Sequence, residues 1–129
     1  MTTELILAHE NMSIGEAIKS LVNNRITGMP VVDQHRHLIG IVSEYDIIKS
    51  VDKYTNRPDA TKPIDLDQPI LYSSKVTSVV EDTAFEDILK LFIEKKVRRL
   101  PVLNTKQELI GIITRRDIMR ILFYRSKKL

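Results

Sequence analysis

The chain has 129 residues, a net charge of +3 and a hydrophobic content of 43%, which fits one compact domain of two closely packed repeats. It contains no cysteine, which excludes a disulfide framework and a thiolate metal site. The sequence has no apolar run of about 18 residues, so no membrane span is expected. Because the N-terminus lacks the basic region of a signal peptide, we expect a cytoplasmic protein.

The first half of the chain predicts a strand, a helix, a β-hairpin and a second helix. Glu4 to Ala8 is a short strand candidate. Apolar residues then follow helical spacing at Ile14, Ala17, Ile18, Leu21 and Val22. Ser13 is the expected N-cap of this helix. The hairpin has one strand that begins at Pro30, a polar turn and a second strand that contains Gly40. The second helix is expected from about Asp46.

The second half predicts the same order of elements. The strand candidates Ile70–Tyr72 and Val76–Val80 come first, and Thr83 is the expected N-cap of a helix, with Glu86 at the spacing of a capping box. The apolar face of this helix is formed by Phe85, Ile88, Leu89, Phe92 and Ile93. A hairpin strand then begins at Pro101, and the last helix follows.

The two halves are related by a constant offset of 71 residues. The matching pairs include Pro30 and Pro101, Gly40 and Gly111, and Asp46 and Asp117. Because no gap interrupts this register, the sequence indicates an internal duplication. We predict repeat 1 at 1–57, a linker rich in proline and charge at 58–69, and repeat 2 at 70–129. Since one such unit is too small to close its own core, the two repeats should pack together. Repeat 1 begins abruptly, which fits either a chain that starts here or a segment of a longer one.

A serine or threonine precedes an aspartate by three residues in both repeats, as Ser43 with Asp46 and Thr114 with Asp117. A carboxylate can accept hydrogen bonds from both vicinal hydroxyls of a ribose, and a short hydroxyl in the same turn can reach the ribose or phosphate. The free N–H groups at a helix start also favour an anion. The alternative interpretation is that each pair only caps its helix.

The Pro-Val-hydrophobic strand, followed by Gly-hydrophobic-hydrophobic-Ser/Thr-x-x-Asp, resembles the CBS domain, which is named after cystathionine beta-synthase. This module usually occurs as a tandem pair, the Bateman module, and the resemblance covers roughly Leu5 to Phe123. It implies an α/β (α+β-like) fold of two βαββα repeats packed about a pseudo-two-fold axis, with one shared core. It also implies a homodimer through the helices, where the exposed apolar candidates are Ile47, Ile48, Ile118, Met119 and Leu122.

In the CBS family the Ser/Thr and Asp positions bind adenosine ribose. The resemblance therefore implies an adenine nucleotide (AMP, ADP or ATP) or S-adenosylmethionine as a regulatory ligand, and a site in the cleft between the repeats. By the family's cross-over geometry, the better-equipped site combines Ser43, Asp46 and Ile41 with Val76, Thr77, Arg98 and Arg99. The second combines Thr114, Asp117 and Ile112 with the N-terminal strand near Thr3 and Glu4, and Arg116 belongs to the predicted set as well.

The arginines Arg98 and Arg99 suit phosphate because the guanidinium fork binds it bidentately. The matching residues of repeat 1, Thr27 and Gly28, carry no charge, so we expect two unequal sites. The alternative for the two arginines is a solvated basic turn.

Three further features were weighed as candidate sites. Gly40 and Gly111 favour either the close approach of a ligand or of another backbone, or tight packing of a helix on the sheet within the pair. His35 and His37 flank a turn residue without a third ligand in view, so no metal site is predicted. Asp33 and Asn104 are predicted to form turns.

Two other classes of function compete with ligand sensing. We do not expect an enzyme, because no histidine lies in the duplicated motif and no P-loop or GxGxxG pattern is present. The alternative is a module for protein interaction or dimerisation, or for nucleic acid at the basic face of repeat 2. Against nucleic acid stand the small net charge, the absence of tryptophan and the few aromatic residues. The output of a sensing module would be read by a regulated partner or a fused domain.

Overall fold

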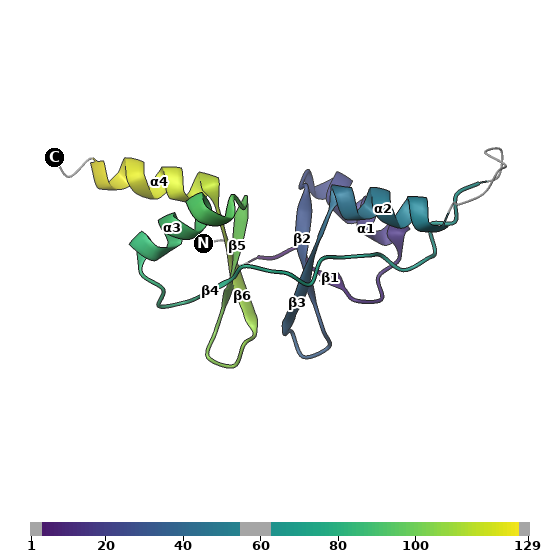
Figure 1. Ribbon diagram of the computed structural model, residues 1–129, viewed down its shortest axis with the longest axis horizontal. Coiled ribbons are helices and arrows are strands. Elements are labelled where there is room, and N and C mark those ends of the chain that lie inside the picture. Colours follow the sequence, from purple (N-terminus) through teal and green to yellow (C-terminus); the bar gives the residue numbers. More distant parts are fainter. Residues whose placement is uncertain (1–3, 55–62, 127–129) are drawn as a thin grey trace. The chain divides into compact units, whose positions relative to one another are not determined.

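The computed structural model describes residues 4–54 and 63–126 (Figure 1). The elements, in chain order, are β1 (Ala8–His9), α1 (Ile14–Asn24), β2 (Gly28–Val32), β3 (Leu38–Ser43), α2 (Glu44–Tyr54), β4 (Val79–Val80), α3 (Phe85–Lys95), β5 (Arg99–Leu103), β6 (Leu109–Thr114) and α4 (Arg115–Ser126). Every element of the first half begins 71 residues before its counterpart in the second half. The predicted mixed α/β fold with two βαββα repeats is therefore confirmed.

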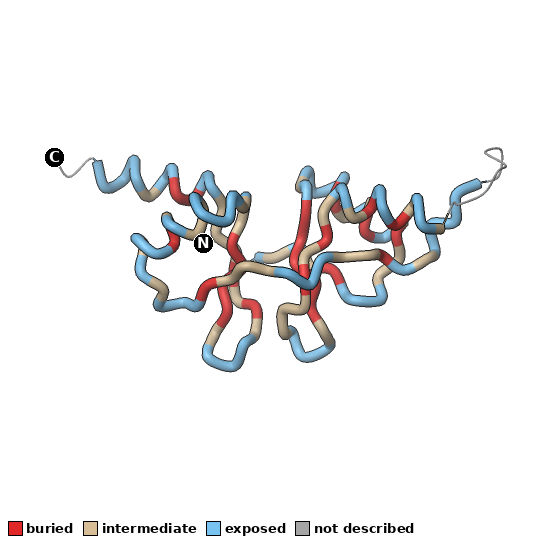
Figure 2. Tube along the Cα trace, in the orientation of Figure 1, coloured by how far each residue is buried: buried red, intermediate tan, exposed pale blue. Residues whose placement is uncertain are grey.

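Each repeat builds one three-stranded sheet with the same topology. In the first, β2 lies between β1, to which it is parallel, and β3, to which it is antiparallel. In the second, β5 takes the central place between β4 and β6. The central strands supply the core, since every residue of β2 and four of the five residues of β5 are buried (Figure 2).

The contacts divide the chain into two compact units. The first, Ile6–Val76, is called the N-terminal unit here, and the second, called the C-terminal unit, continues from Thr77 and includes Glu4 and Leu5. Each unit has its own cluster of buried apolar side chains. The N-terminal cluster includes Ile14, Met29, Val31, Val42 and Ile70, and the C-terminal cluster includes Val79, Ile88, Leu100, Val102 and Ile118. The pseudo-two-fold relation and the shared core stay predictions.

Several predicted bounds are wrong in detail. The first strand is Ala8–His9 rather than Glu4–Ala8, because it pairs only with Val31 and Val32 of β2. Its counterpart in the second half is Val79–Val80 rather than Val76–Val80, and Ile70–Tyr72 forms no strand. The hairpin strands begin at Gly28 and Arg99, two residues before their prolines. Proline is tolerated inside the central strand β2 because the short strand β1 pairs only with Val31 and Val32. Pro30 therefore needs no N–H for the pairing with β1. The helices α2 and α4 begin two residues before Asp46 and Asp117.

The two expected N-caps have different outcomes. Ser13 is confirmed as the N-cap of α1, since its hydroxyl accepts a hydrogen bond from the N–H of Glu16 at 3.1 Å. Thr83 does not cap α3, whose N-cap position is Ala84 with no side-chain hydrogen bond. The hydroxyl of Thr83 instead accepts from the N–H of Val80 at 3.0 Å, which closes the turn before the helix.

The segment 63–76, called the connecting segment here, packs on the N-terminal unit. Near its start, the carbonyls of Leu66 and Gln68 accept hydrogen bonds from the first residues of α1, at 2.9 Å each. Near its end, Ser73 and Ile41 exchange two backbone hydrogen bonds of 2.9 Å. Residues 70–76, which the sequence analysis assigned to repeat 2, therefore belong by contact with repeat 1. Residues 58–62 of the predicted linker lie outside the described part, and the domain boundaries stay a prediction.

Gly40 allows the connecting segment to approach β3. A Cβ atom at this position would lie 2.6 Å from the carbonyl oxygen of Ser73 and would overlap the ring of Tyr72. The structure therefore supports the prediction that Gly40 lets another backbone approach the strand, since the carbonyl of Ser73 and the ring of Tyr72 lie against it.

Candidate ligand-binding site

Ser43 and Asp46 form a reciprocal cap at the junction of β3 and α2. The N–H and the hydroxyl of Ser43 donate to Oδ2 of Asp46 at 2.8 and 2.9 Å, and the N–H of Asp46 lies 3.3 Å from the Ser43 hydroxyl oxygen. The predicted capping role is thus present in the structure. These bonds converge on Oδ2, and Oδ1 of Asp46 accepts none from any described residue. Asp46 as a whole is half-buried, and its role as a ligand-binding residue stays a prediction.

Thr114 and Asp117 repeat this geometry between β6 and α4. The N–H of Thr114 donates to Oδ2 of Asp117 at 2.8 Å, and the N–H of Asp117 donates to the Thr114 hydroxyl at 3.2 Å. Asp117 is more deeply buried than Asp46, and the guanidinium of Arg120 lies 3.6 Å from its Oδ1. Oδ1 of Asp117 therefore lies beside a cation, whereas Oδ1 of Asp46 has no such partner among the described residues. The two Ser/Thr–Asp pairs are thus not equivalent.

The predicted phosphate-binding arginines lie at the start of β5. Arg99 is the register partner of Thr114, and the carbonyl of Arg98 faces the N–H of Arg115 at 3.4 Å. Burial, followed by the charge of Arg98, lowers the pKa of the half-buried Arg99 guanidinium, which stays protonated at neutral pH. At the matching place in the first repeat, Gly28 is the register partner of Ser43 and supplies no charge.

The predicted residues are divided between the two units. Ser43, Asp46, Ile41 and Val76 belong to the N-terminal unit, while Thr77, Arg98, Arg99, Ile112, Thr114, Arg116 and Asp117 belong to the C-terminal unit. Within the first, Ile41 is half-buried and is bridged to the connecting segment, which leads to Val76. Within the second, Arg116 is exposed in the first turn of α4. The cross-over combination of Asp46 with Arg98 and Arg99 stays a prediction, and Thr3 lies outside the described residues.

Ser50 was not among the residues predicted from the sequence. This residue lies one turn after Asp46 in α2 and is completely buried. Its hydroxyl donates to the carbonyl of Asp46 at 2.7 Å and accepts from the N–H of Leu71 at 2.8 Å. The available signal was a serine on the apolar face of α2, four residues after a candidate ligand-binding aspartate.

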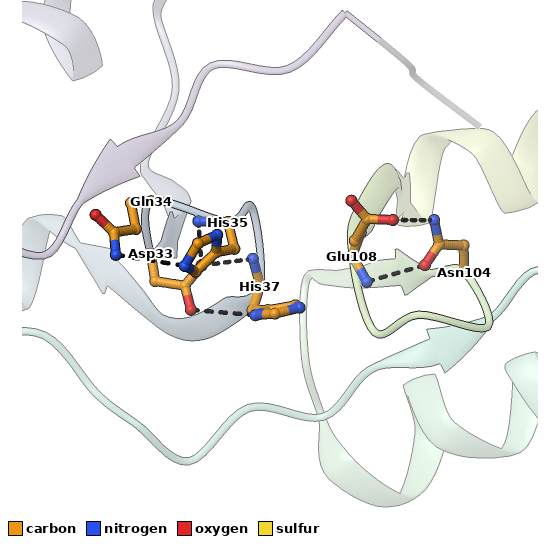
Figure 3. Close-up of polar contacts among 6 residues, drawn as sticks. All are labelled: Asp33, Gln34, His35, His37, Asn104 and Glu108. Carbon is orange, nitrogen blue, oxygen red and sulfur yellow. Dashed lines mark hydrogen bonds and ion pairs between the residues drawn. The ribbon is translucent and has the colours of Figure 1, made fainter.

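The turns between the hairpin strands confirm the prediction for Asp33 and Asn104 (Figure 3). Oδ1 of Asp33 accepts from the N–H groups of His35 and His37 at 2.8 and 2.9 Å. Oδ1 of Asn104 accepts in the same way from Lys106 and Glu108, at 2.9 and 3.0 Å.

Each turn adds a second side-chain contact of its own. Oδ2 of Asp33 lies 3.2 Å from Nδ1 of His37, and Nδ2 of Asn104 donates to Oε1 of Glu108 at 3.1 Å. The two histidines are thus part of a turn. Within residues 4–54 and 63–126, no group of three His, Cys, Asp or Glu side chains is placed to hold a metal ion.

None of the helices in the described part of the chain has the length and apolar character that a membrane crossing requires.

The comparison with known proteins identifies the family. A family model for the CBS domain matches residues 1–53 and 70–124, and the chain therefore belongs to the CBS domain family. The CBS domain-containing protein CBSX1, chloroplastic, of Arabidopsis thaliana is 33% identical over 91% of this chain. The match spans only 58% of the length of that relative.

Solved structures of CBS pairs have the same fold. The crystal structure of CBSX2 in complex with AMP is 29% identical, with a TM-score of 0.76, and the match covers 98% of this chain and 94% of the other. CBSX2 is also an Arabidopsis thaliana protein. The CBS domain pair of protein MJ0100, in complex with 5′-methylthioadenosine and S-adenosyl-L-methionine, is 27% identical with a TM-score of 0.70. That match covers 94% of this chain and 93% of the other.

Proposed function

We propose that this chain is a non-catalytic regulatory module that binds an adenosyl ligand, namely AMP, ADP, ATP or S-adenosylmethionine, in the cytoplasm. The observation that carries the proposal is the cap at Asp46, which uses one carboxylate oxygen and leaves the other unbonded among the described residues. Support also comes from the similarity to CBSX2 with AMP and to the MJ0100 pair with adenosyl ligands.

Each predicted residue has a role in this proposal. Asp46 and Asp117 hold the ribose hydroxyls, and the hydroxyls of Ser43 and Thr114 assist them. Arg98 and Arg99 take the phosphate, since arginine binds it bidentately. The adenine lies against Ile41, Val76 and Thr77 in one site and against Ile112 in the other, and Arg116 adds a positive charge near Asp117.

The ligand acts by binding one arrangement of the two repeats more tightly than another. No bond is broken, and the ligand shifts the equilibrium only by its differential affinity for the two arrangements. A partner protein or a fused domain reads the outcome. The two units contribute unequally to the sites. The C-terminal unit supplies the two arginines and the buried Asp117, whereas the residues of the N-terminal unit that match the arginines carry no charge.

Calorimetry on an aspartate variant tests the ribose contact. Asp46→Ala should weaken the binding of adenosine and AMP alike, by about tenfold to hundredfold, because hydrogen bonds to a charged acceptor contribute about 1.5–3 kcal/mol. Asp46→Asn is the matched control for folding, because its amide oxygen still accepts the capping bonds of Ser43. Wild-type affinity in a folded Asp46→Ala protein would contradict the proposed role.

A second variant separates phosphate from nucleoside. Arg99→Ala should weaken AMP and ATP much more than adenosine, because only the phosphate loses a partner. Equal weakening of adenosine and AMP would contradict this assignment. Titration of oligonucleotides in the same experiment tests the nucleic-acid alternative, which predicts their binding without any preference for adenosyl ligands.

We also propose a homodimer formed through the helices. Of the predicted interface residues, Ile47 and Ile118 are buried in the cores of their own units, whereas Ile48, Met119 and Leu122 are exposed. The observation in favour of a dimer is that two pairs of apolar residues at the 71-residue offset are largely exposed. They are Val22 and Ile93, with exposed fractions of 68% and 74%, and Ile48 and Met119, with 67% and 58%. Apolar positions exposed in both repeats are typical of an interaction surface.

A further inference from the structure

The hydroxyl of Ser50 joins two parts of the N-terminal unit that are distant in sequence. It accepts a hydrogen bond from the N–H of Leu71 at 2.8 Å and donates one to the carbonyl of Asp46 at 2.7 Å. Ser50 is fully buried, so water cannot readily replace it as a partner. Leu71 is half-buried, and an N–H that is shielded from water is costly when it loses its acceptor. The bond therefore ties the connecting segment to the helix that begins with the Ser43–Asp46 cap.

The connecting segment is held at consecutive residues around this bond. The N–H of Ile70 donates to the carbonyl of Met12 at 3.0 Å, and Ser73 forms its reciprocal backbone pair with Ile41. Tyr72, between them, occupies the space that Gly40 leaves beside β3. Residues 70–73 are therefore held against Met12, which precedes α1, and against α2 and β3.

This hydrogen bond is not a general requirement of the repeat. The position that matches Ser50 in the second repeat is Ile121, which is half-buried in α4 and carries no hydroxyl. The α4 helix forms without such a group, and the elements of the two repeats otherwise begin in the same register. The hydrogen bond from the connecting segment to Ser50 is thus not needed for the fold of a repeat.

We infer that Ser50 is a positioning residue for the adenosyl ligand at the Asp46 site. Its hydroxyl fixes the distance between the turn that carries Asp46 and the connecting segment, which runs five residues further to Val76. The group that holds the ribose and the segment that contacts the adenine are thereby arranged before the ligand arrives, which lowers the ordering cost of binding. The inference rests on the proposed function and adds to it a residue that does not touch the ligand.

Two measurements on Ser50→Ala test the inference. The first is hydrogen exchange at the amide of Leu71, which reports the Ser50 bond directly and without a ligand. We expect it to exchange about tenfold faster or more in Ser50→Ala, because its acceptor is lost. The second is calorimetry with adenosine, whose affinity should fall by about fivefold to tenfold.

Ser20→Ala is the matched control. Ser20 is another helical serine of the same unit, and its hydroxyl makes no hydrogen bond to a described residue. The control should change neither quantity.

The outcomes separate this inference from the proposed function. If Ser50→Ala melts cooperatively and binds adenosine as tightly as the wild type, the inference is overturned while the proposed function stands. If the wild-type Leu71 amide exchanges as fast as an unbonded amide, the inference is overturned even where the variant fails to fold. If the wild type binds none of adenosine, AMP, ATP and S-adenosylmethionine, the proposed function fails and the positioning role fails with it.

Discussion

At the scale of single residues, close packing makes Gly40 sensitive to substitution. Gly40→Ala should destabilise the protein by about 1–3 kcal/mol, because the new methyl group overlaps Tyr72 and the Ser73 carbonyl. Urea denaturation measures the loss. Gly15→Ala is the control, since its Cβ would lie 3.3 Å from Leu66 Cβ and helix propensity gains about 0.5–1 kcal/mol. Equal losses in the two variants would contradict the role assigned to Gly40.

The carboxylate of Asp33 makes the first turn sensitive to acid. The pKa of Asp33 is lowered, above all by the hydrogen bond from the N–H of His37. The N–H of His35 and the charge of the His37 ring lower it further, while desolvation opposes them. A lowered pKa in the folded state contributes stability that is present above the ordinary carboxyl value and is lost as the pH falls through the folded value. Asp33→Asn should therefore flatten the dependence of Tm on pH below about 4. A slope equal to that of the wild type would contradict this prediction.

The second turn gives the reciprocal experiment. Asn104 supplies an amide oxygen to two backbone N–H groups and donates to Glu108. Asn104→Asp should keep the backbone bonds but place a carboxylate beside that of Glu108, so the Tm should fall at neutral pH and recover part of the loss towards pH 4. The double variant Asn104→Asp with Glu108→Gln should remove the repulsion. A loss of Tm that does not depend on pH would contradict the electrostatic cause.

At the scale of elements, the helices begin in different ways. The hydroxyl of Ser13 caps α1 by accepting a hydrogen bond from the N–H of Glu16, whereas the N-cap position of α3, Ala84, makes no side-chain hydrogen bond. Ser13→Ala should cost about 1 kcal/mol of stability, as for other N-cap residues. Thr83→Ala should cost less, because its hydroxyl closes an exposed turn at Val80. Chemical denaturation compares the two, and a larger loss for Thr83→Ala would show that the turn matters more than the cap.

At the scale of the whole molecule, the homodimer is the main prediction. Sedimentation at tens of micromolar, an order of magnitude at which a biological dimer should persist, should show a dimer. Met119→Glu should shift it towards monomer, because burying an unpaired charge in an interface is costly. Ile64→Glu is the control, since Ile64 is also exposed, at 52%, but lies in the connecting segment. A wild type that sediments only as a monomer would contradict the prediction.

The order of the elements and the duplicated Ser/Thr–Asp pairs could be predicted from the amino-acid sequence alone. Apolar periodicity and turn residues are patterns of a few neighbouring positions. Because the two repeats are related by a constant offset, an element predicted in one repeat could be compared with the same element in the other. For this reason α1, α3, the hairpins and both Ser/Thr–Asp pairs could be predicted from local patterns. The prediction of the family also followed from these patterns, and the match of the family model confirms it.

Which distant segments of the chain meet could not be predicted from local patterns and is known from the three-dimensional structure. The bond between Ser50 and Leu71 spans 21 residues, and the approach of Ser73 to Gly40 depends on the path of the connecting segment. Neither leaves a periodic signal, since a buried serine and a strand glycine are each compatible with several partners. The prediction at Thr83 failed for a different, local reason, because its hydroxyl had two possible N–H donors three residues away, Val80 and Glu86, and accepts from Val80. Local patterns predict the elements, whereas hydrogen bonds between distant segments depend on how those elements pack.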